Sequence, residues 1–142
     1  ALLADMGLRV LLVDADVQPS LSKYFPLSTR VPAAGLTEVI VRGEVTPACI
    51  TETIYRNLDI VVSDDPEGHL PHWLLNRIDR GFRLRFALQS PVVTGAYDCV
   101  LIDIGAAVTE VPIAVAPRLI SCSNWQTSAM RLTSSPMVVP QP

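Results

Sequence analysis

The amino-acid sequence predicts an α/β fold, a doubly wound, mostly parallel sheet with flanking helices. Three runs rich in β-branched residues and leucine, RVLLVDAD, NLDIVVSDD and YDCVLIDIG, each close on acidic or small residues. Continuous apolar runs of this kind are typical of strands that are buried on both faces of a parallel sheet. Stretches with helical spacing separate the three runs, as expected for a doubly wound sheet.

The first part of the chain alternates helices with the first strand. The opening ALLADMG has apolar residues at positions 2, 3 and 6, and Gly7 stands where a helix often ends in a left-handed residue. We therefore expect the chain to begin inside a helix and the sheet to be incomplete at the N-terminus. After the first strand, SLSKYF predicts a short helix with a serine cap, and GLTEVIVRG predicts another helix with Thr37 near its start.

The second half has one long helical stretch and a weakly patterned end. From His69 to about Leu88, apolar residues recur at helical spacing with an interruption near Gly81. After the third strand, a short fourth strand is predicted at Leu119–Cys122. We expect residues 1–118 to form a partial α/β domain. Residues 119–142 are expected to be an irregular or disordered tail, because Pro and Ser cluster there without periodicity.

Composition narrows the class of protein. The chain has 142 residues, 49% of them apolar and 18% charged, which suits one globular domain. A net charge of -3 gives no field that attracts the whole chain to phosphates, so nucleic-acid binding would need a local basic patch. The apolar runs are too short to span a bilayer, and a cytoplasmic location is expected. The three cysteines are widely spaced, against a disulfide framework and a zinc site.

Acidic residues at two strand ends are the candidate site. Asp14 and Asp16 follow the first strand, and Asp103 lies near the end of the third. A buried carboxylate is costly unless it is paired or bound to a cation, and ligands of such sheets bind at the carboxyl ends of the strands. The alternative is that these acids cap a loop or the next helix. Both interpretations stay open at this point.

Two of the runs resemble a known family. VLLVDADVQPSLSKYF resembles the second nucleotide-site motif of the ParA/MinD family of deviant Walker ATPases, in which a strand ends D-x-D-P-Q. YDCVLIDIG resembles the Walker B strand of that family. GLTEVI and LDIVVSDD resemble its intervening helix and central strand, so the resemblance covers about Ala1 to Gly105. It implies a P-loop NTPase-like fold of the SIMIBI class, with the CobQ/CobB/MinD/ParA type of nucleotide-binding domain.

The resemblance also implies roles for four residues. Asp16 would be catalytic, positioning the attacking water beside the γ-phosphate, and Asp14 would support it at the magnesium shell. Asp103 would hold Mg²⁺ through a water, as Walker B acids do. Ser20 lies in the segment that senses the γ-phosphate in this family. ATP and Mg²⁺ are therefore the expected cofactors of the complete protein.

The sequence departs from the family pattern in two places. The D-P-Q of the family is here Asp16-Val17-Gln18, with the proline displaced to Pro19. There is also no G-K-[ST] in the chain, whereas the family builds its phosphate cradle from a K-G-G-x-G-K-[ST] loop just before the first helix. We therefore expect a truncated chain that is inactive by itself, with ATP hydrolysis belonging to the full-length protein.

The function that the resemblance implies is that of a ParA-like ATPase, which partitions or positions DNA of a chromosome, plasmid or integrated element. Such a protein would form a homodimer when complete and ATP-bound, and would act with a DNA-bound partner protein. One alternative is a bacterial tyrosine-kinase-like domain, although no tyrosine follows Tyr97. A second alternative is a non-catalytic remnant or interaction module that keeps the fold without a nucleotide site.

Two other groups of residues have simpler interpretations. His69 and His72 could present two imidazoles to a metal, but no further ligand is evident, so surface histidines near a helix start are the simpler reading. Four arginines, Arg77, Arg80, Arg83 and Arg85, form a basic run interrupted by Asp79. That run is either a solvated helical face or a contact for nucleic acid or a partner.

Overall fold

The computed structural model describes residues 2–16, 19, 21–28, 32–104 and 119–123. The elements in chain order are α1 (Leu2–Asp5), β1 (Val10–Asp14), α2 (Leu21–Tyr24), α3 (Leu36–Arg42), the 3-10 helix η1 (Pro47–Cys49), β2 (Thr51–Glu52), β3 (Leu58–Val61), α4 (His69–Leu75), α5 (Arg83–Ala87), α6 (Pro91–Ala96), β4 (Cys99–Ile104) and β5 (Leu119–Ser123).

The described strands form one five-stranded sheet in the order β2-β3-β1-β4-β5. β1 is central and runs parallel to β3 and β4, and β5 runs parallel to β4. Only β2 is antiparallel, pairing with β3 through two residues. The predicted α/β fold with a mostly parallel sheet is confirmed, including the short strand expected at Leu119–Cys122. Residues 124–142 lie outside the described part of the chain, so the domain boundary after residue 118 and the tail stay predictions, although 119–123 belong to the sheet.

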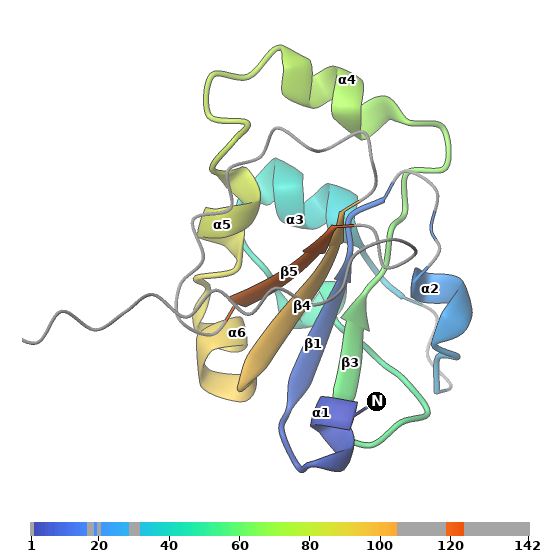
Figure 1. Cartoon of the computed structure of the whole chain (residues 1–142). Coiled ribbons are helices and arrows are strands. Elements are labelled where there is room, and N and C mark those ends of the chain that lie inside the picture. Colours follow the sequence, from blue (N-terminus) through green and yellow to red (C-terminus); the bar gives the residue numbers. More distant parts are fainter. Residues whose placement is uncertain (1, 17–18, 20, 29–31, 105–118, 124–142) are drawn as a thin grey trace, which may run out of the picture.

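The central strand explains why the sheet is covered on both faces. Residues Val10 to Val13 are at most 3% exposed, because their side chains alternate between two apolar clusters. Leu11 and Val13 pack with residues of α3, α4, α5 and α6, whereas Val10 and Leu12 pack with residues of α1 and α2. Figure 1 shows α1 and α2 on one side of the strands and α3, α5 and α6 on the other. The sheet is therefore doubly wound, as predicted.

The helix ends follow the sequence signals in part. Gly7 has φ +91° after α1, and Gly43 has φ +78° after α3, so both occupy the left-handed region that favours glycine. The helical stretch from His69 is interrupted between α4 and α5, as the pattern around Gly81 predicts. Thr37 lies in the first turn of α3, as predicted, but no side-chain cap comes from the residue before the helix. Among the described residues, no helix is long and apolar enough to cross a membrane.

Candidate functional site

The candidate site lies at the carboxyl ends of the parallel strands. Asp14 of β1 and Asp103 of β4 are register partners, although 89 positions separate them in the sequence. Register partners in a parallel pair point to the same face of the sheet, so the two side chains share the face of Leu12. The backbone N–H of Ala15 donates to the carbonyl of Asp103 at 2.8 Å and extends the pairing past the end of β1. The structure thus brings two of the four predicted site residues together.

Asp14 is fully buried and half satisfied. Its Oδ2 accepts hydrogen bonds from the backbone N–H of Ser22 at 2.8 Å and from the Ser22 hydroxyl at 2.7 Å. Asp14 therefore caps the first turn of α2, which is one of the alternatives that the sequence left open. Its other oxygen, Oδ1, is buried and has no hydrogen-bond partner within the described part of the chain. A buried carboxylate oxygen without a partner is costly, so this atom has capacity for a ligand.

The other two predicted site residues are placed less completely. Asp16 lies two residues beyond β1 and is half-buried, and its backbone carbonyl accepts the Ser63 hydroxyl at 2.8 Å. That bond ties the segment after β1 to the segment after β3. Asp103 is also half-buried. Ser20 lies outside the described residues, so its assignment to the γ-phosphate segment stays a prediction.

Two acids that follow β3, Asp64 and Asp65, were not among the predicted site residues. Asp64 accepts the backbone N–H of Thr37 at 2.8 Å, and Asp65 accepts those of His69 at 2.9 Å and Leu70 at 2.6 Å. These two acids therefore cap α3 and α4, where they offset the positive end of each helix. The signal was present, since an S-D-D triplet follows an apolar run. The cap of α4 is local, because Asp65 lies four residues before His69, whereas the cap of α3 by Asp64 depends on the fold.

Gly35, just before α3, lies in close contact with the end of β3. A Cβ built on it would lie 2.6 Å from both the Asp64 Cγ and the carbonyl oxygen of Val62. The backbone N–H of Leu36 donates to that same carbonyl at 2.9 Å. Only glycine allows the start of α3 to come this close to the end of β3. The N-terminus of α3 is thereby fixed beside the acids.

The residues present fit magnesium as one component of a shared site. Within the described residues, no group of three or more His, Cys, Asp or Glu side chains could hold a metal ion alone. Mg²⁺ does not need such a cage, because it keeps several waters and is commonly bound through one or two carboxylates together with substrate phosphates. Asp14 with its unpartnered Oδ1 and Asp103 in register supply that number of carboxylates.

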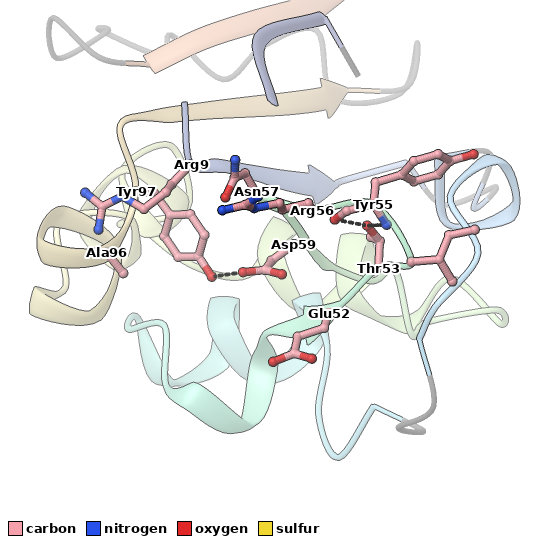
Figure 2. Close-up of a pocket in the computed structure, with 10 residues that line it drawn as sticks. Arg9, Glu52, Thr53, Tyr55, Arg56, Asn57, Asp59, Ala96 and Tyr97 are labelled. Carbon is pink, nitrogen blue, oxygen red and sulfur yellow. Dashed lines mark hydrogen bonds between the residues drawn. The ribbon is translucent and has the colours of Figure 1, made fainter. Parts of the chain in front are cut away.

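A hollow on the described part of the chain lies away from these acids. A cavity of about 570 Å³ is lined by residues at the amino ends of β1 and β3 and by the end of α6, among them Arg9, Asp59 and Tyr97 (Figure 2). The Tyr97 hydroxyl donates to Asp59 at 2.7 Å, and burial together with this bond raises the pKa of Tyr97. We place the candidate site at the other edge, because ligands of parallel sheets bind at the carboxyl ends of the strands.

Comparison with known proteins agrees with the fold. A model of the AAA_31 family, an AAA domain, matches residues 1–129. A crystal structure of cobyrinic acid a,c-diamide synthase from Mycobacterium smegmatis with bound ADP and magnesium is 29% identical, with a TM-score of 0.56, over 70% of this chain and 40% of its own.

Two further solved structures share the fold. Apo McdA from Cyanothece is 24% identical with a TM-score of 0.53, over 70% of this chain and 48% of its own. A plasmid partition protein from Borrelia burgdorferi is 21% identical with a TM-score of 0.52, over 75% of this chain and 57% of its own. This chain thus spans about half the length of the solved structures that it matches. No curated protein sequence matches it.

Proposed function

Because the chain belongs to the AAA_31 family, within the ParA/MinD-like group of P-loop ATPases, we propose that the protein acts as a ParA-like ATPase in the partitioning or positioning of DNA. ATP hydrolysis is then the activity of the whole protein, with a homodimer and a DNA-bound partner protein as its assembly. Plasmid partition proteins are among the structures that share this fold, and the synthase structure holds ADP and magnesium.

One observation carries the proposal more than any other. Asp14 and Asp103 stand side by side at the carboxyl ends of two adjacent parallel strands, and the buried Oδ1 of Asp14 has no partner within the described residues. Burying a carboxylate in this state is unfavourable unless a cation or a donor completes it. A site that receives Mg²⁺ together with a nucleotide phosphate accounts for both features.

Each acid then has its own task. Asp103 and Asp14 would hold the ion, the first through a water and the second through Oδ1. When bound, Mg²⁺ neutralises charge that develops on the phosphate oxygens. Asp16 would orient the attacking water and accept its proton, and the hydrogen bond from Ser63 to the Asp16 carbonyl restrains the backbone that carries this carboxylate.

The chain lacks one component that this reaction requires. Its single lysine is Lys23, and no G-K-[ST] occurs in it, so the cradle for the phosphates must be supplied for the test. We would therefore measure Mg·ATP affinity and single-turnover hydrolysis on a form of the protein in which a phosphate-binding loop and its strand precede Ala1. The unsubstituted form should bind Mg·ATP and hydrolyse it.

Substitutions of Asp16 and Asp103 should have different effects in the protein with the added loop. Asp16→Ala should leave binding intact and lower turnover about 10²-fold or more, because it removes a group that acts in the transition state. Asp103→Ala should weaken Mg·ATP binding about 10-fold to 100-fold, as loss of an outer-shell metal partner does. Asp5→Ala, which removes an exposed acid of α1, is the matched control and should change neither. Hydrolysis by Asp16→Ala at the unsubstituted rate would exclude Asp16 as the water-orienting residue.

A non-catalytic interaction module is the second candidate, and one observation favours it. One carboxylate oxygen of Asp14 caps α2, so this acid has a structural role that needs no nucleotide. If the form with the added loop folds but binds no Mg·ATP, the module is the better description.

A further inference from the structure

A second surface combines exposed apolar side chains with two arginines that form no ion pair with any described residue. It runs from the end of α4 to α5 and consists of Leu75, Ile78, Arg80, Phe82, Arg85 and Phe86, which we name the α4–α5 surface. Its four large apolar residues are 47–104% exposed, with Ile78 fully exposed. Four of the eleven large exposed hydrophobics among the described residues thus fall within twelve positions. Clustered exposure of this kind marks interaction sites more often than single exposed residues do.

The backbone beneath this surface is held firmly. Asp79 accepts hydrogen bonds from Arg77 at 2.9 Å and from Arg83 at 2.9 Å, and both guanidinium groups lie over the Trp73 ring, 5.0 and 5.3 Å from its centroid. Arg83 also donates to the carbonyls of Ile40 and Val41 at the end of α3. The exposed side chains therefore stand on a fixed support, and a partner would not have to order the segment before binding it.

These contacts divide the four arginines into two classes. Arg77 and Arg83 form ion pairs with Asp79. The Arg83 side chain is only 15% exposed, so the interpretation of the run as a solvated helical face is wrong for Arg83. Arg80 donates to the carbonyl of Leu75 and forms no ion pair with a described residue, and the same absence of an ion pair holds for Arg85. Two positive charges therefore flank the apolar side chains without a counter-charge among the residues described.

The distribution of charge identifies the chemistry of the occupant. Residues 69–89 carry four arginines and one aspartate, whereas the rest of the chain carries seven basic and thirteen acidic residues. The α4–α5 surface is thus a basic region on an acidic protein, and its complement is acidic. Residues 124–142 contain one arginine and no acid, so they lack that complement. Phosphate chains would satisfy the two arginines but would leave the aliphatic side chains of Leu75 and Ile78 in water.

We propose that the α4–α5 surface docks an acidic segment of a partner protein, one that presents apolar side chains at helical spacing beside Glu or Asp. The apolar side chains of that segment cover Leu75, Ile78 and the Phe82–Phe86 pair, whose ring centroids lie 6.1 Å apart. Its carboxylates face Arg80 and Arg85 at the rim, where charge sets orientation and partner choice. None of the strand-end acids takes part, so this inference stands independently of the nucleotide site.

The test uses the 142-residue chain and a fluorescein-labelled synthetic peptide of about 18 residues, about 27 Å long as a helix. Leu and Phe occupy one face of the peptide and Glu the other. Fluorescence anisotropy should show saturable binding, weakened about 10-fold by either Ile78→Ser or Phe86→Ser. Arg85→Glu should weaken binding by a similar factor and reduce its dependence on salt. The matched controls are Ile54→Ser and Arg56→Glu. Both positions lie away from this surface, and Ile54 is 59% exposed.

The other occupants are separate arms of the same experiment. A peptide with Lys in place of Glu should bind at least about 10-fold more weakly, and equal binding would overturn the proposal. Absence of saturable binding by the acidic peptide would also overturn it. Three other results would overturn it if the same variants abolished them: binding to vesicles with about 30% phosphatidylglycerol, binding to a DNA duplex of about 20 base pairs, or self-association of the chain in sedimentation experiments. Circular dichroism checks that each variant is folded.

Discussion

Replacing Ser22 by alanine isolates the interaction that joins Asp14 to α2. The Ser22 hydroxyl donates to Asp14 Oδ2 at 2.7 Å, and the backbone N–H of the same residue donates at 2.8 Å. Ser22→Ala removes the first donor and keeps the second. Because Asp14 is fully buried, the lost bond leaves a carboxylate oxygen less satisfied with no water to replace the donor.

The magnitude follows from the charge of the acceptor. Hydrogen bonds to charged groups contribute about 1.5–3 kcal/mol net, against about 0.5–1.5 kcal/mol for neutral pairs. We expect Ser22→Ala to lower the free energy of unfolding by about 1.5–3 kcal/mol, which for a chain of this length is roughly 5–10 °C in Tm. Ser63→Ala is the matched control, because its hydroxyl donates to a neutral acceptor, the Asp16 carbonyl, at the same edge. It should cost about 0.5–1.5 kcal/mol.

Urea unfolding followed by circular dichroism measures both variants, with unchanged m-values as evidence that the unfolded state is the same. A double-mutant cycle with Asp14→Asn separates the pair from its surroundings: the cost of Ser22→Ala should fall to the neutral range in the Asp14→Asn background. The reasoning is refuted if Ser22→Ala costs no more than Ser63→Ala, or if its cost is the same whether or not position 14 carries a charge.

Three further predictions test the edges of the sheet and the missing phosphate cradle, and a fourth tests the α4–α5 support. Gly35→Ala should destabilise by about 1–3 kcal/mol in urea unfolding, because its Cβ would lie 2.6 Å from a carbonyl oxygen; an unchanged midpoint would contradict this. Burial and the hydrogen bond to Asp59 raise the pKa of Tyr97, so the folded state keeps a proton that the unfolded state releases near its ordinary value of about 10. The free energy of unfolding should therefore fall as pH rises above about 10, and Tyr97→Phe should remove this part of the decline. Hydrogen bonds from Arg77 and Arg83 lower the pKa of Asp79, so Asp79→Asn should be destabilising at neutral pH, with a difference that shrinks as pH falls below about 4; a difference independent of pH would argue against the ion pairs. The 142-residue chain should show no measurable Mg·ATP affinity with a fluorescent ATP analogue, because Asp14, Asp16 and Asp103 repel a polyphosphate that no lysine-bearing loop offsets; micromolar affinity would contradict the absence of a phosphate cradle.

Much of the fold could be predicted because its signals are local. The strands β1, β3 and β4 are apolar runs that need no partner to be recognised, and the left-handed Gly7 and Gly43 mark helix ends in the sequence itself. β2 could not be predicted, since two residues carry no periodicity. The cap of α3 could not be predicted either, because it comes from Asp64, 27 positions after the residue that it holds.

The candidate site divides in the same way. That Asp14, Asp16 and Asp103 would stand at strand ends follows from where the apolar runs stop, and a resemblance to the ParA/MinD family follows from the same residues. The apolar run before each acid does not determine whether that acid caps a helix or faces a ligand. In Asp14 the Oδ2 oxygen caps α2, and the Oδ1 oxygen has no hydrogen-bond partner among the described residues.

By itself, the sequence determined the type and order of the main elements and the placement of acids after buried strands, since both depend on residues that are neighbours in the chain. Only the tertiary structure decided that β1 lies between β3 and β4, and that Asp14 pairs in register with Asp103. Strand order and register come from packing between residues far apart in the sequence, such as Val13 with Ile102 in one apolar cluster. A shift of one residue in that packing would turn Asp103 to the opposite face and separate the two carboxylates.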